Sequence, residues 1–378
     1  MNYPIRYYIC RILLTLFFIF PIKNKRVYFK SYFGKYYNDN PKAISSALKL
    51  YNSDVEIVWS MKNPKELNEE NIIVTKTNTL KDLYYIATSR VWVDNCRKGA
   101  WVKKRKKQYY IQTWHAGITM KYVEADAAAK LPKEYRFNAI NDGKMSDLMI
   151  SNSSWCTQLY KRAFWFSGDI AEIGTPRIDR LINYSEEKAF ETKRKMGIPD
   201  DSHVVLYAPT FRNNGGFEIY NSLDMKAICD LLSNMYGDDW LPLIRLHPNL
   251  KNSDGFDTKG AMNVTDYGDV YELIGISDIF ITDYSSTMFE AAYCGKKTIL
   301  YVPDIEQYTS EREQYFKFEN LPFPLAENME EMSKALQDAF NSEYLTKVEH
   351  FFKSIDVRED GHASEKAAKI ICEIINKV

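Results

Sequence analysis

Four segments of the chain carry side chains suited to proton transfer and phosphate binding. They are "QTWHAG" (112–117), "YAPTFR" (207–212), "RLHP" (245–248) and "ITDYSS" (281–286). Histidine exchanges protons near neutral pH because its unperturbed pKa is about 6.5. Arginine and hydroxyl side chains donate hydrogen bonds to phosphate oxygens. The candidate residues of these segments are His115, Thr210, Arg212, Arg245, His247, Asp283, Ser285 and Ser286.

The segment 278–294 is the most informative single piece of the sequence. An apolar strand ends at Asp283, and Ser285 and Ser286 then begin a helix of small and apolar residues. The free N–H groups and the dipole at a helix start favour anions, so this point is suited to a phosphate group. The structural alternative is an ordinary helix cap, which Asp and Ser commonly supply.

The other basic residues have structural alternatives too. Arg245 and His247 stand at alternate positions where a strand ends, so both side chains can face one cleft. Otherwise they are an ion-paired arginine and a surface histidine. Arg212 either binds a substrate or is solvated. Arg177 in "GTPRID" (174–179) either faces a substrate-binding cleft or belongs to a structural turn. In "DGHAS" (360–364), Ser364 either caps the final helix or contacts a substrate.

Alternating strand-like and helix-like segments must position these residues, which predicts an α/β fold with parallel sheets. Strands are expected at 26–33, 55–61, 90–95, 108–114, 147–153 and 169–176, and in the second half at 203–211, 241–248, 278–286 and 297–304. In open α/β sheets, ligands bind at the carboxyl ends of the strands. We therefore expect two doubly wound, Rossmann-like domains facing a cleft, 27–185 and 186–378, connected by a charged helix within 178–200.

Residues 1–26 form a separate segment with an apolar run and basic flanks. The apolar run 12–20 is flanked by Arg11 and Lys23, but no small-residue cleavage site follows it. It is also shorter than the roughly 20 residues that span a bilayer. We expect a membrane-associating segment that lies in the interface, with a preference for anionic headgroups. The alternative is a first helix buried in the domain core.

Composition excludes several classes of protein. A chain of 378 residues favours two domains. Its 50 basic and 50 acidic residues balance, so the basic run 97–107 does not indicate a nucleic-acid partner. The six cysteines show no CxxC spacing and suit a reducing cytosol. No GxGxxG, Walker, HExxH, GxSxG or DxD motif is present, which argues against dehydrogenases, NTPases, metalloproteases, serine hydrolases and metal-dependent sugar transferases.

Seven segments in order resemble the CDP-glycerol glycerophosphotransferases, which build teichoic acids and related polymers on bacterial membranes. The resemblance covers residues 33–366 and rests on "QTWHAGITMK", "SNSSWCTQLY", "GTPRID", "LYAPTFR", "RLHP", "ITDYSSTMFEAAYCGKKTILYVPD" and "DGHAS". It implies a GT-B fold with an acceptor-side N-terminal domain and a C-terminal domain that binds the CDP-glycerol donor. One departure is Ala116, which stands where the family often has glycine, with Gly117 next.

The resemblance also implies roles for individual residues. His115 is the general base that deprotonates an acceptor hydroxyl, and His247 stabilises the phosphates and the leaving CMP. The donor contacts fall on Thr210, Arg212, Arg245, Asp283, Ser285 and Ser286, with Arg177, Asp360 and Ser364 as further substrate contacts. The expected partners are CDP-glycerol, a lipid-linked saccharide or polymer and the membrane surface, at the cytoplasmic face and peripherally bound. No tightly bound cofactor and no metal ligand are expected.

Several alternatives remain open at this point. The donor can be CDP-ribitol or a nucleotide sugar, because polyol contacts leave no readable motif. The chain can also be a catalytically inactive, membrane-bound relative, although the retained histidines and paired serines speak against it. The identity of the acceptor, the number of units added, the requirement for a metal and the oligomeric state are not set by the sequence.

Overall fold

The computed structural model describes residues 5–210, 218–246 and 257–377, and these divide into two compact units. Unit 1 comprises 1–118, 123–179 and 356–378, and unit 2 comprises 119–122 and 180–355. The domain boundary predicted from the sequence lies at residue 185, with all later residues in the second domain. The structure instead divides the chain after Asp179, and residues 356–378 belong to unit 1.

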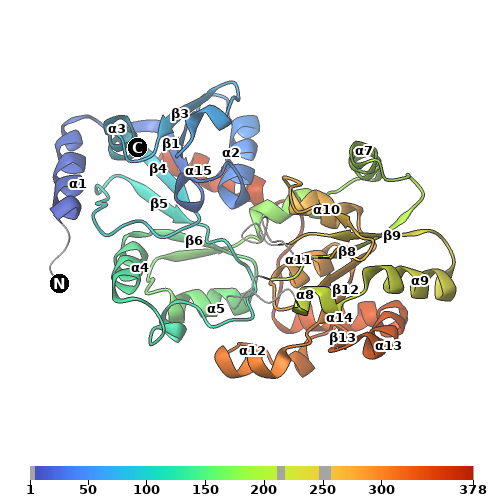
Figure 1. Cartoon of the computed structure of the whole chain (residues 1–378). Helices are drawn as coiled ribbons and strands as arrows, with labels where there is room; N and C mark the ends of the chain where they lie inside the picture. The colour runs from blue at the N-terminus through green and yellow to red at the C-terminus, as the bar shows by residue number, and fades with distance from the viewer. Residues whose placement is uncertain (1–4, 211–217, 247–256, 378) are drawn as a thin grey trace. The chain divides into compact units, whose positions relative to one another are not determined.

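Unit 1 is built on a parallel sheet of seven strands in the order β3-β2-β1-β4-β5-β6-β7 (Figure 1). The strands are β1 (Lys23–Lys30), β2 (Glu56–Met61), β3 (Ile72–Lys76), β4 (Ser89–Asp94), β5 (Tyr109–Gln112), β6 (Leu148–Ser151) and β7 (Asp169–Glu172). The helices are α1 (Ile5–Leu16), α2 (Asp39–Tyr51), α3 (Leu80–Thr88), α4 (Lys133–Met145), α5 (Ser154–Ala163) and α15 (Ala363–Asn376).

Both faces of this sheet are covered, as its sequence pattern requires. Val27 and Phe29 of β1 join one apolar cluster, which includes residues of α2 and α15. Tyr28, between them, joins a second cluster with residues of α1 and α3. Successive side chains of a strand point to opposite faces, so a strand buried on both faces is apolar throughout.

Helix α15 explains why the end of the chain belongs to unit 1. Its apolar face packs beside α2 (Figure 1) and buries Ala367, Ala368, Ile371 and Ile375 in the first cluster. The chain returns to this unit through a hydrogen bond of 2.7 Å from the Arg358 N–H to the Asn152 carbonyl. An amphipathic pattern predicts a helix with one buried face, but it does not say which sheet that face covers.

Unit 2 contains a parallel sheet of six strands in the order β10-β9-β8-β11-β12-β13. The strands are β8 (His203–Tyr207), β9 (Trp240–Ile244), β10 (Met262–Asn263), β11 (Ile279–Thr282), β12 (Lys297–Tyr301) and β13 (Leu325–Ala326). The helices include α8 (Glu218–Ser222), α9 (Met225–Tyr236), α10 (Val270–Ile276), α11 (Thr287–Tyr293), α12 (Ile305–Glu311), α13 (Met329–Phe340) and α14 (Glu343–Ser354). The predicted α/β class with parallel sheets is confirmed in both units.

The expected charged helix between the halves consists of two helices. These are α6 (Asp179–Ile182) and α7 (Glu186–Met196). The Ser185 side chain accepts a hydrogen bond from the Lys188 N–H and so caps α7. At the other end, Gly197 adopts a left-handed conformation with φ of 70°, which terminates the helix.

The N-terminal segment is helical but only partly buried. Leu14 is fully buried, and α1 packs on α3. Ile5, Ile9, Ile12 and Leu16 are between 49% and 78% exposed. Helix α1 thus packs on unit 1 through one face and leaves another face exposed. No helix in the described part of the chain is long and apolar enough to cross a membrane.

Candidate active site

His115 lies just beyond the carboxyl end of β5, in a turn with a strained backbone. The Gln112 side chain accepts a hydrogen bond of 2.9 Å from the Trp114 N–H. Trp114 itself has φ of 53°, a left-handed conformation that costs free energy in a bulky residue. Its ring is fixed edge-on against Phe164, with centroids 4.9 Å apart. The turn therefore holds His115 in one place, half-buried at the end of the sheet.

The hydrogen bonding of His115 defines its tautomer. Its Nδ1 lies 2.9 Å from the Asn95 carbonyl oxygen. A carbonyl oxygen only accepts, so Nδ1 carries the proton and Nε2 of the neutral ring keeps a lone pair. Burial lowers the pKa of His115, and this effect outweighs the hydrogen bond to Asn95 and the charge of Asp39, which raise it. The lowered pKa favours the neutral ring at neutral pH.

A buried polar network supports the His115 ring. Tyr32 contacts it, with ring centroids 5.7 Å apart, and the Tyr32 hydroxyl donates to Asp39 Oδ2 at 2.7 Å. Arg177, which is buried, forms an ion pair with Asp39 at 3.4 Å. The Asn40 side chain accepts from the Arg177 N–H at 3.0 Å and donates to the Trp114 carbonyl at 3.1 Å. Arg177 is therefore close to His115 within unit 1.

Gly117 occupies a position with no room for a side chain. A Cβ atom there would lie 2.6 Å from Nδ2 of Asn152. Asn152 is buried and donates to Glu359 Oε1 at 2.9 Å, and Glu359 also accepts from both the N–H and the hydroxyl of Thr175. Gly117 thus allows the turn after His115 to pack directly on the Asn152–Glu359 pair.

Gly117→Ala is expected to lower the free energy of unfolding by about 1–3 kcal/mol, because overpacking displaces Asn152 from Glu359. Urea unfolding measures the effect. Gly268→Ala is the matched control, since a Cβ atom at Gly268 meets nothing within 4 Å. Its effect should stay within about 0.5 kcal/mol. Equal stabilities of the two variants would contradict this account of Gly117.

Asp360 and Ser364 lie in unit 1, at the start of α15. The Ser364 hydroxyl and N–H both donate to Asp179 Oδ2, and the Ala363 N–H donates to Asp179 Oδ1 at 3.0 Å. Ser364 thus attaches the helix to Asp179. The exposed Asp360 pairs with Lys366, which is the main reason that its pKa is lowered.

In unit 2, Asp283 joins the loops that follow β8 and β11. Its carboxylate is almost completely buried and accepts from the Thr210 N–H at 3.0 Å and from the Thr210 hydroxyl at 2.9 Å. The Tyr284 N–H donates to the same carboxylate at 2.6 Å. Asp283 therefore fixes the shape of both loops, and the structure brings Thr210 and Asp283 together as the sequence led us to expect.

The two serines that follow are half-buried at the start of α11. The Ser285 hydroxyl lies 2.7 Å from the Thr287 hydroxyl. Ser286 is the N-cap residue but makes no side-chain capping hydrogen bond. Within the described residues its hydroxyl has no hydrogen-bond partner, so it is available to a ligand. Tyr284, between Asp283 and Ser285, stacks on Tyr308 at a centroid distance of 3.4 Å.

Arg245 points toward backbone carbonyls of its own unit. Its guanidinium donates to the Tyr267 carbonyl at 2.5 Å and to the Val264 carbonyl at 3.5 Å, and burial lowers its pKa. These bonds give it a structural role in addition to any contact with substrate. Arg212 and His247 lie outside the described residues.

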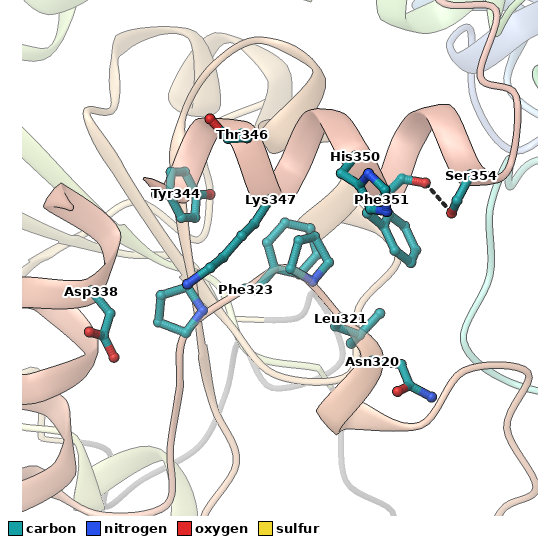
Figure 2. Close-up of a pocket in the computed structure, with 12 residues that line it drawn as sticks. Asn320, Leu321, Phe323, Asp338, Tyr344, Thr346, Lys347, His350, Phe351 and Ser354 are labelled. Carbon is teal, nitrogen blue, oxygen red and sulfur yellow. Dashed lines mark hydrogen bonds between the residues drawn. The ribbon is translucent and has the colours of Figure 1, made fainter. Parts of the chain in front are cut away.

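A cavity of about 670 Å³ lies in unit 2 between α14 and the loop 320–324. Figure 2 shows the residues that line it. His350, Phe351 and Phe323 line it, and Ser354 donates to the Phe351 carbonyl at 2.7 Å. None of the residues expected to bind the donor lines this cavity. Its size alone does not connect it with phosphate chemistry. Among the described residues, no group of three or more His, Cys, Asp and Glu side chains could hold a metal ion.

Comparison with known proteins decides the family. Residues 12–373 match the family model of the CDP-Glycerol:Poly(glycerophosphate) glycerophosphotransferases. The chain belongs to this family. The membership that the seven segments implied is confirmed.

Several relatives are named teichoic acid poly(glycerol phosphate) polymerase. The one from Bacillus spizizenii is 30% identical over 93% of this chain and 93% of its own length. The one from Bacillus subtilis is 31% identical over 93% of this chain. The chain spans only 49% of the length of the B. subtilis relative.

The fold is similar to that of the wall teichoic acid polymerase TagF. A structure of TagF is 28% identical in sequence, with a TM-score of 0.84 over 100% of this chain and 99% of that chain. A TagF variant soaked with CDP-glycerol gives a TM-score of 0.82, also at 28% identity, over 97% of this chain and 94% of that chain. The chain therefore has an α/β fold of the GT-B-like kind seen in TagF.

The residues that support His115 could not be identified from the sequence. Asp39 and Asn40 stand in the polar run 38–40 before Pro41, which predicts only a turn at a helix start. Glu359 precedes the "DGHAS" segment and gave no signal of its own. Asn95 acts through its backbone carbonyl, which no side-chain pattern reveals.

Proposed function

We propose that this chain transfers glycerol phosphate from CDP-glycerol to a hydroxyl group of a membrane-linked acceptor in teichoic acid or capsular polymer synthesis. The acceptor oxygen attacks the phosphorus that bears glycerol. The bond from this phosphorus to the oxygen bridging it to the CMP phosphorus breaks, and CMP leaves with that oxygen. The acceptor proton moves to a base on the protein.

The hydrogen bond from His115 Nδ1 to the Asn95 carbonyl is the observation that carries this proposal. It leaves Nε2 of the neutral ring free to take the proton of the attacking hydroxyl. A positioned general base contributes roughly 10²–10⁴-fold to the rate. Asp39 and Arg177 act through Tyr32 and the turn at Trp114, and are positioning residues in this account.

The donor phosphates are assigned to the loops of unit 2. The Ser285 and Ser286 hydroxyls supply hydrogen-bond donors, and Asp283 fixes the loop that carries them. Arg212, Arg245 and His247 are the positive or titratable groups expected on the same substrate. Phosphoryl transfer depends mainly on positioning and on stabilisation of charge, which suits such a set of donors.

A panel of donors tests this assignment. Release of the leaving nucleotide, CMP from the CDP-polyols and UDP from UDP-sugars, should require an acceptor. It should be fastest with CDP-glycerol, slower with CDP-ribitol and absent with UDP-sugars. Release that is fastest with CDP-ribitol would favour a ribitol-phosphate transferase. No release with either CDP-polyol from the folded protein would favour an inactive relative.

The exposed face of α1 supports peripheral attachment at the membrane. Ile5, Ile9, Ile12 and Leu16 follow helical spacing and are exposed on one stripe, which Ile19 extends at 81% exposure. Such a stripe with basic residues nearby is typical of helices that lie in the membrane interface. We assign this stripe to the cytoplasmic face of the membrane, where a lipid-linked acceptor is presented.

Replacing Ile9, Ile12 and Leu16 together with serine is expected to lower co-sedimentation with anionic vesicles at least tenfold, since each buried CH₂ contributes about 0.8 kcal/mol to binding. Leu50→Ser is the matched control, because Leu50 is 89% exposed in the same unit but lies outside α1. It should bind vesicles as the wild type does. Equal binding of the triple variant would refute attachment through α1.

A further inference from the structure

A second cavity lies within unit 1, at the carboxyl ends of β1 to β4. Its volume is about 250 Å³, and it is lined by Lys30, Lys62, Asn78, Asp82, Asp94 and Lys98 together with aromatic side chains. The carboxylates and Lys98 are buried, whereas Lys62 and Asn78 are exposed at the rim. The cavity thus opens to solvent on one side and has a charged floor.

The charges on the floor are already satisfied within the protein. Asp82 accepts from the Tyr28 hydroxyl at 2.9 Å and from the Asn78 N–H at 2.8 Å. Asp94 pairs with Lys98 at 2.6 Å. Burying a charge is costly unless it is paired and hydrogen-bonded, and these groups meet that requirement.

Lys30 and Lys62 differ from the floor residues. Lys30 is half-buried at the end of β1, and Lys62 follows β2. Neither ammonium group has a hydrogen-bond or ion-pair partner among the described residues. Burial lowers the pKa of Lys30, and the nearby positive charges of Lys98 and Lys62 add to this effect, opposing Asp82 and Asp94. An anion bound beside Lys30 would compensate for the lost hydration.

The loop after β1 connects this cavity with His115. Tyr32, Phe33 and Gly34 have φ values of 44°, 59° and 81°, three left-handed conformations in succession. The Tyr32 ring contacts His115, while the next residue, Phe33, lines the cavity. Backbone strain of this kind persists where the surroundings enforce it, and it is concentrated at functional sites. Here it places the two sites on either side of one short loop.

The volume limits what can bind. Pockets for drug-sized ligands begin at about 300 Å³, so this cavity is too small for a whole nucleotide donor. The cavity has room for one small ligand group. The lysines suit a phosphate group, and the remaining acceptor capacity of Asp82 and Asp94 suits hydroxyl groups.

We propose that this cavity is an acceptor subsite that binds a phosphorylated polyol, the glycerol phosphate unit adjoining the hydroxyl presented to His115. Lys30 and Lys62 hold the phosphate group. The inference rests on the proposed function, because it assigns the cavity to the acceptor of that reaction. The same chemical group occurs in phosphatidylglycerol headgroups, so the test must separate the two sources.

Calorimetric titration of the full chain with sn-glycerol 3-phosphate, without CDP-glycerol, tests the subsite. Lys30→Met should weaken binding at least tenfold, because a hydrogen bond to a charged group is lost. Lys62→Met, at the exposed rim, should also weaken it while leaving the fold intact. Lys65→Met is the control, since Lys65 is an exposed lysine that does not line the cavity. Wild-type affinity in both cavity variants would overturn the proposal.

Titrations with related ligands and binding to lipid vesicles identify what the cavity recognises. Inorganic phosphate and glycerol should each bind more weakly than sn-glycerol 3-phosphate, and equal affinity for phosphate alone would overturn recognition of the polyol. Vesicles of phosphatidylglycerol should bind wild type and Lys30→Met equally. A loss of vesicle binding in this variant would overturn the assignment to the acceptor.

Kinetics separate this inference from the proposed function. Lys30→Met should raise the KM for a glycerol-phosphate-ended acceptor at least tenfold and leave the KM for CDP-glycerol unchanged. An unchanged KM for that acceptor would overturn the subsite. If wild type released no CMP from any CDP-polyol, the proposed function would fail, and the calorimetry would still decide whether the cavity binds a phosphorylated polyol.

Discussion

Replacing His115 with alanine is expected to lower acceptor-dependent CMP release by about 10²–10⁴-fold, the usual contribution of a general base. The variant should still fold, since the ring is half-buried and its one hydrogen bond among the described residues is to the Asn95 carbonyl. Binding of CDP-glycerol should change little, because the donor is assigned to unit 2. His350→Ala, a change at an exposed histidine, is the matched control and should retain full activity.

The pH profile provides an independent check on the role of His115. A general base works only when it is neutral, so kcat/KM should fall as the pH drops through its pKa. Burial lowers this pKa, and the acidic limb is therefore expected below the ordinary value of about 6.5. A profile of kcat/KM against pH measures it. An unchanged limb in a residually active His115→Asn variant would show that another group is the base.

The second large effect is expected for Asp283→Ala. Removing the carboxylate leaves the Thr210 N–H, the Thr210 hydroxyl and the Tyr284 N–H without this acceptor. Each unsatisfied buried group costs about 1–3 kcal/mol, so the free energy of unfolding should fall by about 3 kcal/mol or more. CMP release should fall about 100-fold, because small displacements of positioning loops have effects of that size. Urea unfolding and steady-state kinetics measure the two effects.

Thr210→Val is the control for Asp283. It removes the hydroxyl bond to the carboxylate but keeps the N–H bond, so a loss of about 1 kcal/mol is expected. Asp283→Asn should lie between the two, because the amide keeps one oxygen as an acceptor. If Asp283→Ala were as stable and as active as Thr210→Val, the carboxylate would not organise these loops.

The ends of the strands could be predicted from the sequence because two signals coincide there. Apolar runs such as 279–281 predict buried strands, and the polar residues that follow mark their carboxyl ends. His115, Thr210 and Asp283 were found in this way. The contact between Thr210 and Asp283 followed from the topology, since the parallel pairing of β8 with β11 brings the following loops together.

Contacts between distant segments could not be predicted in the same way. Asp39 lies 138 residues from its ion-pair partner Arg177, and neither has a local pattern that specifies the other. Ser364 had the pattern of a helix cap, but its partner Asp179 lies 185 residues away. The position of Arg245 at the end of a strand predicts a substrate-binding residue. Its hydrogen bonds, however, go to carbonyl oxygens of a neighbouring loop. Such choices depend on tertiary packing rather than on local propensity.

The connecting segment shows that composition alone does not predict where a helix is interrupted. The charged segment 178–200 predicts one helix that ends at Gly197 and Pro199, because residues that favour helix predominate before them. Ser185 interrupts it, since a side chain that accepts from the N–H three residues later begins a new helix. Only the capping geometry distinguishes this break from a continuous helix.

Mass spectrometry of the acceptor tests the central claim most directly. Purified protein would be incubated with CDP-glycerol and a defined lipid-linked acceptor in detergent, beside His115→Ala. We expect acceptor molecules heavier by one or more glycerol phosphate units, formed together with CMP and absent in the variant. CMP release without any change in the mass of the acceptor, or full product formation by His115→Ala, would contradict this claim.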